Sequence, residues 1–287
     1  MTQTLLSIGH GYSARALEER LMTGGWSIIA TTRSEEKASE LEARGIKALV
    51  WPGTDLPLED VTHVLISVSP QGSDPVLEHF ADRFERATHL RWIGYLSTVG
   101  VYGDHKGRWV DEESLTQPVL ARSRARLEAE AAWQAVAARA GVPLHIFRLA
   151  GIYGPGRGPF EKLRKGQAQR VIKPGQYFSR IHYEDIGLAL ELSILSGLDS
   201  RIFNLCDDSP APPQDVLEHA AQLLGIPVPP EIDFEKADLS PMARSFYSDN
   251  KRVRNDRIKR ELGWQPRYPD YRRGLAAILA AEGRLQS

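Results

Sequence analysis

Two glycines and an alanine at fixed spacing near the N-terminus could bind phosphate groups. Residues 4–8 (Thr-Leu-Leu-Ser-Ile) predict a short buried strand, and the run from Gly9 to Ala14 then reads G-x-G-x-x-A. Between a strand and a helix, such a turn presents backbone N–H groups to the pyrophosphate of a dinucleotide. The helix expected from Arg15 onward adds partial positive charge at its N-terminus. The predicted cofactor contacts in this turn are Gly9, His10, Gly11, Tyr12, Ser13 and Ala14.

The end of the second predicted strand, residues 26–32, indicates which dinucleotide suits the turn. A site specific for NAD places Asp or Glu about 20 residues after the first glycine, where its carboxylate accepts from the ribose 2′-hydroxyl. This chain has no acid there and continues with Arg33 and Ser34. A guanidinium suits the extra 2′-phosphate of NADP, which it binds with a planar, charged fork. The sequence therefore predicts NADP(H) in preference to NAD(H), bound by Thr32, Arg33 and Ser34; alternatively, Arg33 is a solvated loop residue.

Composition excludes several classes of protein. The 287 residues suffice for one α/β domain plus a smaller lobe. The net charge of −1 does not indicate binding to nucleic acid or to a membrane surface. Cys206 is the only cysteine, which rules out an intrachain disulfide and fits a reducing compartment. The chain has no bilayer-spanning apolar run, no secretion signal and no metal-ligand spacing among its histidines. We expect a soluble, cytoplasmic protein with a small-molecule substrate.

Apolar runs and helical patterns alternate through the first half of the chain. The strands and helices that they predict must position the cofactor-binding residues described above. The pattern predicts an α/β fold with a Rossmann-type, doubly wound parallel sheet and helices on both faces. Such sheets bind ligands at the carboxyl ends of their strands, so Ser67 and Ser97 are further predicted cofactor contacts. Strands are expected at 45–50, 63–68, 91–97 and 144–149, and helices at 35–44, 75–87 and 122–140, the last ending at a Gly141 C-cap.

The pattern changes after Gly151. Glycine and proline cluster at residues 154–159, proline recurs between 210 and 230, and strongly patterned strands become scarce. Residues 201–206 are expected to return to the sheet as a last strand. We therefore predict a dinucleotide-binding domain from residues 1–155 plus about 180–206, and a smaller substrate-binding lobe from about 156–179 and 207–287.

Five segments, in order along the chain, resemble those of one enzyme family. Residues 96–103 (Leu-Ser-Thr-Val-Gly-Val-Tyr-Gly) are similar to the S-[ST]-x-x-V-Y-G segment of the extended short-chain dehydrogenase/reductases, the group of nucleotide-sugar epimerases and dehydratases. Matching segments follow at 149–156, 180–185, 203–208 and 262–268. With the glycine turn, the resemblance spans nearly the whole chain. It is greatest with the atypical members, which keep the fold and change the active site.

The resemblance implies an active site from which this chain departs. In the family, a Ser or Thr after the fifth strand holds the substrate oxygen, and Thr98 occupies that position. A Tyr in a Y-x-x-x-K unit on the next helix transfers the proton, while its Lys lowers the pKa of the Tyr and binds the nicotinamide ribose. Residues 120–130 contain neither Tyr nor Lys.

Two registers of that helix are open. The match of Glu130 to the family's K-x-x-x-E favours one that places Arg126 at the Lys position and Arg122 at the Tyr position; the other places Arg124 and Leu120 there. An Arg can supply a fixed charge and a ribose donor, but it cannot shuttle a proton, because its pKa exceeds about 12.

Losing a positioned proton-transfer group costs about 10²–10⁴ in rate, so the usual alcohol–ketone mechanism is either supplied by other residues or absent. Tyr102, Asp104 and His105 follow the fifth strand at its ligand-facing end. Tyr102 is a catalytic candidate, although the resemblance implies mostly a packing role for it. For His105, in a hydrophilic loop, exposure is the expected state.

The resemblance also limits the range of possible substrates, because residues that family members use for particular substrates are absent here. Family dehydratases carry Asp-Glu after the catalytic Thr, whereas this chain has Val99-Gly100, and the Asn before the Y-G-P segment of epimerases is Gly151 here. These departures count against a standard nucleotide-sugar substrate. Candidate anionic contacts are Arg157, Arg180 and Lys251.

Two hypotheses of function remain. The first is an NADP(H)-dependent oxidoreductase or epimerase-like enzyme acting on a small polar carbonyl or hydroxyl compound, with Thr98 orienting the substrate oxygen. The second is a non-catalytic NADP(H)-binding sensor that changes a surface or partner contact with cofactor occupancy. The resemblance also implies a homodimer through helices on a sheet face.

Overall fold

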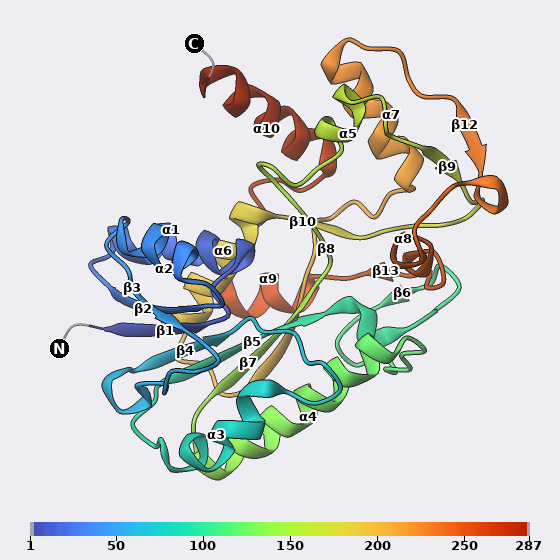
Figure 1. The fold of residues 1–287 in the computed structure, drawn as a ribbon. Coiled ribbons are helices and arrows are strands. Elements are labelled where there is room, and N and C mark those ends of the chain that lie inside the picture. The colour runs from blue at the N-terminus through green and yellow to red at the C-terminus, as the bar shows by residue number, and fades with distance from the viewer. Residues whose placement is uncertain (1–2, 286–287) are drawn as a thin grey trace.

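A seven-stranded sheet forms the centre of the computed structural model, which describes residues 3–285 (Figure 1). Its neighbouring strands all pair in parallel, in the order β11-β7-β5-β4-β1-β2-β3. The predicted α/β fold class with a doubly wound sheet is confirmed. The strands are β1 (Thr4–Ile8), β2 (Ser27–Thr32), β3 (Lys47–Val50), β4 (His63–Ile66), β5 (Trp92–Thr98), β7 (Leu144–Leu149) and β11 (Arg201–Leu205).

The strand order reverses at β1, which pairs with β2 on one side and β4 on the other. Gly9 follows the end of β1, and Ser67 follows the end of β4. Both therefore lie at the crevice where open parallel sheets bind ligands.

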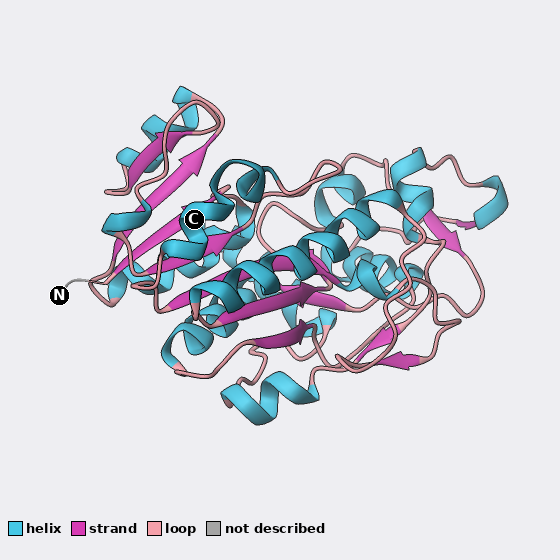
Figure 2. Ribbon diagram, turned by 90° about the horizontal axis from the view of Figure 1, so that it is seen from below, coloured by secondary structure: helices cyan, strands magenta, loops and turns pink. Residues whose placement is uncertain are grey.

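Helices cover both faces of the sheet, each over its own apolar cluster (Figures 1 and 2). One cluster includes Leu17 of α1, Leu41 of α2 and Ile186 of α6. The other includes Phe84 of α3 and Trp133 of α4, whose rings meet edge to face at 4.9 Å. The helices are α1 (Tyr12–Thr23), α2 (Glu35–Glu42), α3 (Pro75–Arg86), α4 (Ala121–Ala140), α6 (Tyr183–Leu195) and α9 (Asp256–Leu262).

Several element boundaries differ from the prediction. Helix α1 begins at Tyr12, three residues before the predicted start, so Ser13 and Ala14 belong to its first turn. Strand β4 ends at Ile66, before Ser67, and β5 extends to Thr98. The predicted helix end at Gly141 is confirmed, since that glycine adopts φ 67° as the C-cap of α4.

The rest of the described chain forms small sheets and short helices, several beyond the carboxyl edge of the large sheet (Figure 1). Helices α5, α7 and α10 share a separate apolar cluster. The proposed division into two domains rests on this second core. The remaining elements are β6 (Trp109–Val110), β8 (Gly151–Tyr153), α5 (Phe160–Arg164), β9 (Arg170–Ile172), β10 (Arg180–His182), α7 (Pro213–Leu224), β12 (Glu231–Asp233), α8 (Pro241–Phe246), β13 (Arg252–Val253) and α10 (Tyr271–Leu285), with 3₁₀ turns η1 (Leu58–Asp60), η2 (Val99–Tyr102) and η3 (Phe234–Lys236).

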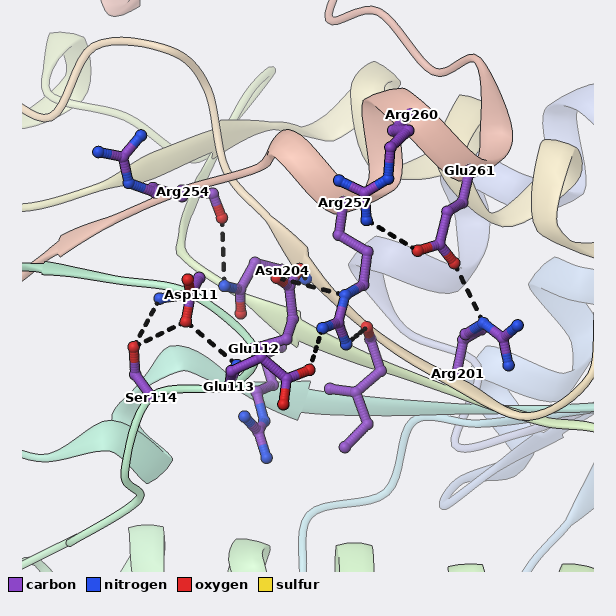
Figure 3. Close-up of polar contacts among 12 residues, drawn as sticks. Asp111, Glu112, Glu113, Ser114, Arg201, Asn204, Arg254, Arg257, Arg260 and Glu261 are labelled. Atoms are coloured by element: carbon purple, nitrogen blue, oxygen red, sulfur yellow. Dashed lines mark hydrogen bonds and ion pairs between the residues drawn. The ribbon is translucent and has the colours of Figure 1, made fainter.

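The loop between β5 and α4 is anchored on edge strand β11 by a buried carboxylate (Figure 3). Glu112 accepts the backbone N–H of Asn204 at 2.8 Å, and the Arg257 guanidinium lies 3.8 Å away. Burial raises the pKa of Glu112 above its ordinary value. The side chain of Asn204 in turn donates to the carbonyl oxygen of Arg254 at 3.1 Å. The bond from Glu112 satisfies the backbone N–H of Asn204, which has no neighbouring strand to bind at the edge of the sheet. Together these bonds fix the loop that leads into α4.

Among residues 3–285, no helix combines the length and the apolar character that crossing a membrane requires.

Candidate functional site

A cleft of about 1090 Å³ opens at the carboxyl ends of the central strands. Its walls come from the glycine turn, the end of β5, the start of α4, the loop before β10 and helix α8. The predicted site residues that line it are Gly9, Gly11, Tyr12, Ser13, Ala14, Ser67, Ser97, Thr98, Arg122 and Arg126.

The glycine turn has the geometry that a phosphate-binding turn requires. Gly9 adopts φ +77°, and a Cβ there would lie 2.6 Å from Val68 Cγ2. Its N–H donates to Thr31 Oγ1 at 2.8 Å, which ties the turn to the end of β2. A Cβ on Gly11 would meet only the carbonyl oxygen of Gly9, at 3.7 Å. The space in front of Gly11, at the N-terminus of α1, is therefore open to a phosphate.

The side chain of His10 does not face the cleft, and the prediction that it contacts the cofactor is corrected here. Its Nδ1 lies 2.9 Å from Ser7 Oγ and its Nε2 lies 2.8 Å from Glu18 Oε2. Burial alone would raise the pKa of Glu18, but the hydrogen bonds from His10 and Arg44 lower it. His10 thus fastens the turn to the core through a buried polar cluster.

Tyr12 connects the turn to the opposite wall of the cleft. Its hydroxyl donates to the carbonyl oxygen of Pro155 at 3.0 Å, and its ring lies 4.8 Å from the ring of Tyr183. The guanidinium of Arg157 lies 5.6 Å from the centre of the Tyr12 ring. Burial raises the pKa of Tyr12 to about 12, which keeps this phenol protonated as a hydrogen-bond donor.

The three residues predicted to bind a 2′-phosphate lie beside the turn, outside the lining of the cleft. Thr32 is buried at the end of β2, and Ser34 caps α2 by accepting the N–H of Lys37 at 3.4 Å. Arg33 is exposed and forms no ion pair or hydrogen bond with the described residues. Its guanidinium is therefore available to an anionic group that extends past β2.

An unpartnered polar atom at the end of β4 indicates that the cleft is built for a polar ligand. Ser67 Oγ is buried and has no hydrogen-bond partner among the described residues. Ser97 also lines the cleft, but its hydroxyl donates to the buried carboxylate of Glu130. The open space at Gly11 and the unsatisfied hydroxyl of Ser67 fit a bound dinucleotide.

Arg126 is fixed at the ends of β4 and β5. Its Nη1 donates to the carbonyl oxygens of Leu96 at 2.8 Å and Val68 at 3.2 Å, and its Nη2 donates to Ser69 Oγ at 2.9 Å. Arg124, the alternative at the Lys position, is exposed and does not line the cleft. The geometry therefore favours the register that places Arg126 where the family has its Lys.

Arg122 extends across the cleft to helix α8 instead of replacing the Tyr. Its Nη2 donates to Ser245 Oγ at 2.8 Å, and its guanidinium lies 5.0 Å from the centre of the Phe246 ring. Sequence reasoning missed α8 as part of the site, because its residues carry no recognisable motif. The predicted catalytic role of Arg122 is corrected to a contact between the two walls.

Tyr102 has the packing role that the resemblance implies, and its fully buried side chain does not reach the cleft. Its hydroxyl donates to Asn204 Oδ1 at 2.7 Å and accepts from Arg148 at 3.1 Å, while burial raises its pKa to about 12. His105 is also buried rather than exposed, with Nε2 lying 3.1 Å from the carbonyl oxygen of Tyr102. Asp104 accepts the N–H of Asn250 at 2.9 Å, so all three residues hold the loop.

Cationic side chains predominate on the cleft wall. Arg180 Nη1 donates to the carbonyl oxygen of Phe178 at 2.9 Å, and burial lowers the pKa of Arg180 despite the nearby charge of Asp207. Lys251 Nζ donates to the carbonyl oxygen of Gly103 at 2.8 Å, and burial lowers its pKa. The cationic lining residues are Arg122, Arg126, Arg157, Arg180 and Lys251, and the one acidic lining residue, Asp249, pairs with Lys251 at 3.3 Å. Such a wall favours an anionic ligand.

Comparisons with known proteins place the chain among proteins of this fold. No family model matches it. A solved structure of a functionally unknown conserved protein from Silicibacter pomeroyi is 56% identical, covers 98% of this chain and 99% of its own, and superposes with a TM-score of 0.93. Protein YeeZ of Escherichia coli (strain K12) is 26% identical over 283 residues, which cover 92% of this chain and 95% of YeeZ. The chain belongs to one family with the Silicibacter pomeroyi protein.

A more distant structure identifies the fold. UDP-glucuronic acid 4-epimerase from Bacillus cereus, solved in complex with NAD, superposes with a TM-score of 0.77 at 14% identity, covering 99% of this chain and 100% of its own. This likeness shows that the chain has the same fold as that epimerase.

Proposed function

We propose that this protein is an NADP(H)-dependent oxidoreductase of the extended short-chain dehydrogenase/reductase fold, acting on a small anionic carbonyl or hydroxyl compound. The observation that carries the proposal is the convergence of three features on one cleft: the open glycine turn, the unsatisfied Ser67 hydroxyl and the fixed Arg126. The Bacillus cereus epimerase, which shares the fold, was solved with NAD.

Each wall has a separate role in this proposal. The turn and the N-terminus of α1 hold the pyrophosphate, and Arg126 holds the nicotinamide ribose with a fixed positive charge. Thr98 orients the substrate oxygen; its Oγ1 accepts the N–H of Gly100 at 3.1 Å, which leaves the hydroxyl hydrogen to donate. A nicotinamide bound there would supply or take up a hydride. Arg157 and Arg180 compensate the charge of the substrate, since Lys251 already pairs with Asp249.

Turnover tests the proposal against the non-catalytic alternative. Purified protein with NADPH is assayed against aldehydes, ketones and 4-keto-sugars, including carboxylated members such as 4-formylbenzoate. We expect saturable oxidation of NADPH with at least one anionic carbonyl compound, and its loss in Thr98→Val. Tight binding of NADPH without turnover across the panel would instead establish a sensor.

Arg33→Ala tests the cofactor preference. We expect it to weaken NADPH binding by about 1.5–3 kcal/mol, or about 10–150-fold, because it removes a charge-assisted contact to the 2′-phosphate. Binding of NADH is expected to change little, since that cofactor has no such phosphate. Affinities are measured by titration calorimetry, with Arg91→Ala as the control at an exposed arginine before β5. Equal weakening of both cofactors would refute the assignment.

A further inference from the structure

Two hydroxyl groups in the cleft converge on the same point. A Cβ on Gly100 would lie 2.9 Å from Ser123 Oγ and 3.3 Å from Thr98 Oγ1. The glycine leaves this point without a side chain, and all three residues line the cleft. Sequence reasoning assigned no role to Ser123.

Ser123 lies on the helical face that carries Arg126. Residues three apart on a helix are neighbours, and Ser123 precedes Arg126 by three positions. The two adjacent residues of α4 differ sharply: Ser123 is 3% exposed, whereas Arg122 is exposed and bonded to α8. Ser123 therefore places a hydroxyl on the buried side of α4, three positions before Arg126.

Both hydroxyls are free to donate. Thr98 Oγ1 is engaged only as an acceptor of the Gly100 N–H. Ser123 Oγ has no hydrogen-bond partner within residues 3–285, and it is not one of the fully buried unpartnered atoms, so it is accessible from the cleft that Ser123 lines. Two hydroxyl hydrogens that face one cleft without an acceptor in the protein are free to donate to an acceptor atom of a ligand.

We propose that Ser123 is a second substrate-binding hydroxyl, which together with Thr98 holds the reacting oxygen in place of the absent Tyr. The inference rests on the proposed oxidoreductase function. With a reduced nicotinamide bound, the carbonyl carbon of the substrate would take up a hydride, and the carbonyl oxygen would gain the electron pair of the C=O π bond. Ser123 and Thr98 donate to that oxygen as its negative charge develops. The resulting alkoxide takes a proton through the Ser123 hydroxyl, which regains one from water, so the products are the alcohol, the oxidised nicotinamide and hydroxide.

The test compares Ser123→Ala, Gly100→Ala and the double variant, with NADPH and 4-formylbenzoate as the probe. We expect Ser123→Ala to lower kcat about 100-fold, the usual effect of removing one donor to a developing oxyanion. Affinity for NADPH, measured by fluorescence, and the thermal unfolding midpoint should stay at wild-type values. Glu128→Ala, on the exposed side of α4, serves as the control variant.

The Gly100 variants separate a chemical role from a structural one. Gly100→Ala places a methyl group between the two hydroxyls, so we expect it to lower both kcat and stability. Adding Ser123→Ala removes the 2.9 Å conflict and should restore stability while kcat stays low. Restored turnover in the double variant, or a kcat of Ser123→Ala within threefold of wild type, would overturn the inference alone. A wild-type protein that binds NADPH and reduces no carbonyl compound of the panel would overturn the proposed function and this inference with it.

Discussion

Gly11→Val is expected to weaken NADPH binding about 100-fold or more, equivalent to about 2.7 kcal/mol, while the fold stays intact. Gly11 has extended backbone angles that suit a β-branched residue, and a Cβ there meets only one atom, at 3.7 Å. The added side chain would occupy the space in which the pyrophosphate approaches the N-terminus of α1. Substitution therefore blocks the ligand without disturbing the protein.

Calorimetric titration with NADPH, together with urea unfolding, measures both halves of this expectation. Gly158→Val is the matched control, because a Cβ there meets nothing within 4 Å and Gly158 does not line the cleft. Wild-type affinity in Gly11→Val would place the phosphates elsewhere. A large loss of stability in Gly11→Val would mean that the glycine is required by the fold rather than by the cofactor.

Arg148→Met is expected to cost about 3–5 kcal/mol of the free energy of unfolding, a large share of the about 5–15 kcal/mol typical of a domain. Arg148 donates to Glu130 Oε2 at 2.8 Å, and the two side chains are 5% and 3% exposed. Burial alone would lower the pKa of Arg148, but the charge and hydrogen bonds of Glu130 raise it above its ordinary value. Removing the guanidinium leaves a carboxylate buried beneath the cleft with Ser97 as its remaining side-chain partner.

Chemical denaturation of the single and double variants tests this pair. Adding Glu130→Met to Arg148→Met should recover most of the lost stability, because no uncompensated charge then remains in the core. A single variant within about 1 kcal/mol of wild type would show that the buried carboxylate is stabilised without Arg148.

The parts of the molecule that depend on local sequence could be predicted. The strand, turn and helix around Gly9 and Gly11 follow from short-range rules for glycine spacing and apolar runs, so both the fold class and the open turn were predictable. The spacing between Arg126 and Glu130 favoured one register of α4 but left a second open; the position of Arg126 at the ends of β4 and β5 favours the first. The start of α1 was misplaced by three residues, since no side-chain cap marks it.

The predictions that failed concern side chains whose orientation depends on residues far away in the sequence. Arg122 points toward Ser245, which is 123 residues away in the sequence, and no local sequence pattern predicts that contact. Tyr102 was placed at the correct end of β5, but its orientation follows from Asn204 and Arg148, which bind its hydroxyl in the core. Ser123 escaped notice because a single serine in a helix has no sequence signal. Its role depends on the Cβ that Gly100 lacks.

The central claim is that the cleft binds a nicotinamide dinucleotide and prefers the phosphorylated form. Isothermal titration of the wild-type protein with NADPH and with NADH tests it most directly. We predict saturable heat for one NADPH per chain and an affinity for NADH at least about 10-fold lower, the equivalent of about 1.4 kcal/mol. An absence of heat with both cofactors would contradict the account.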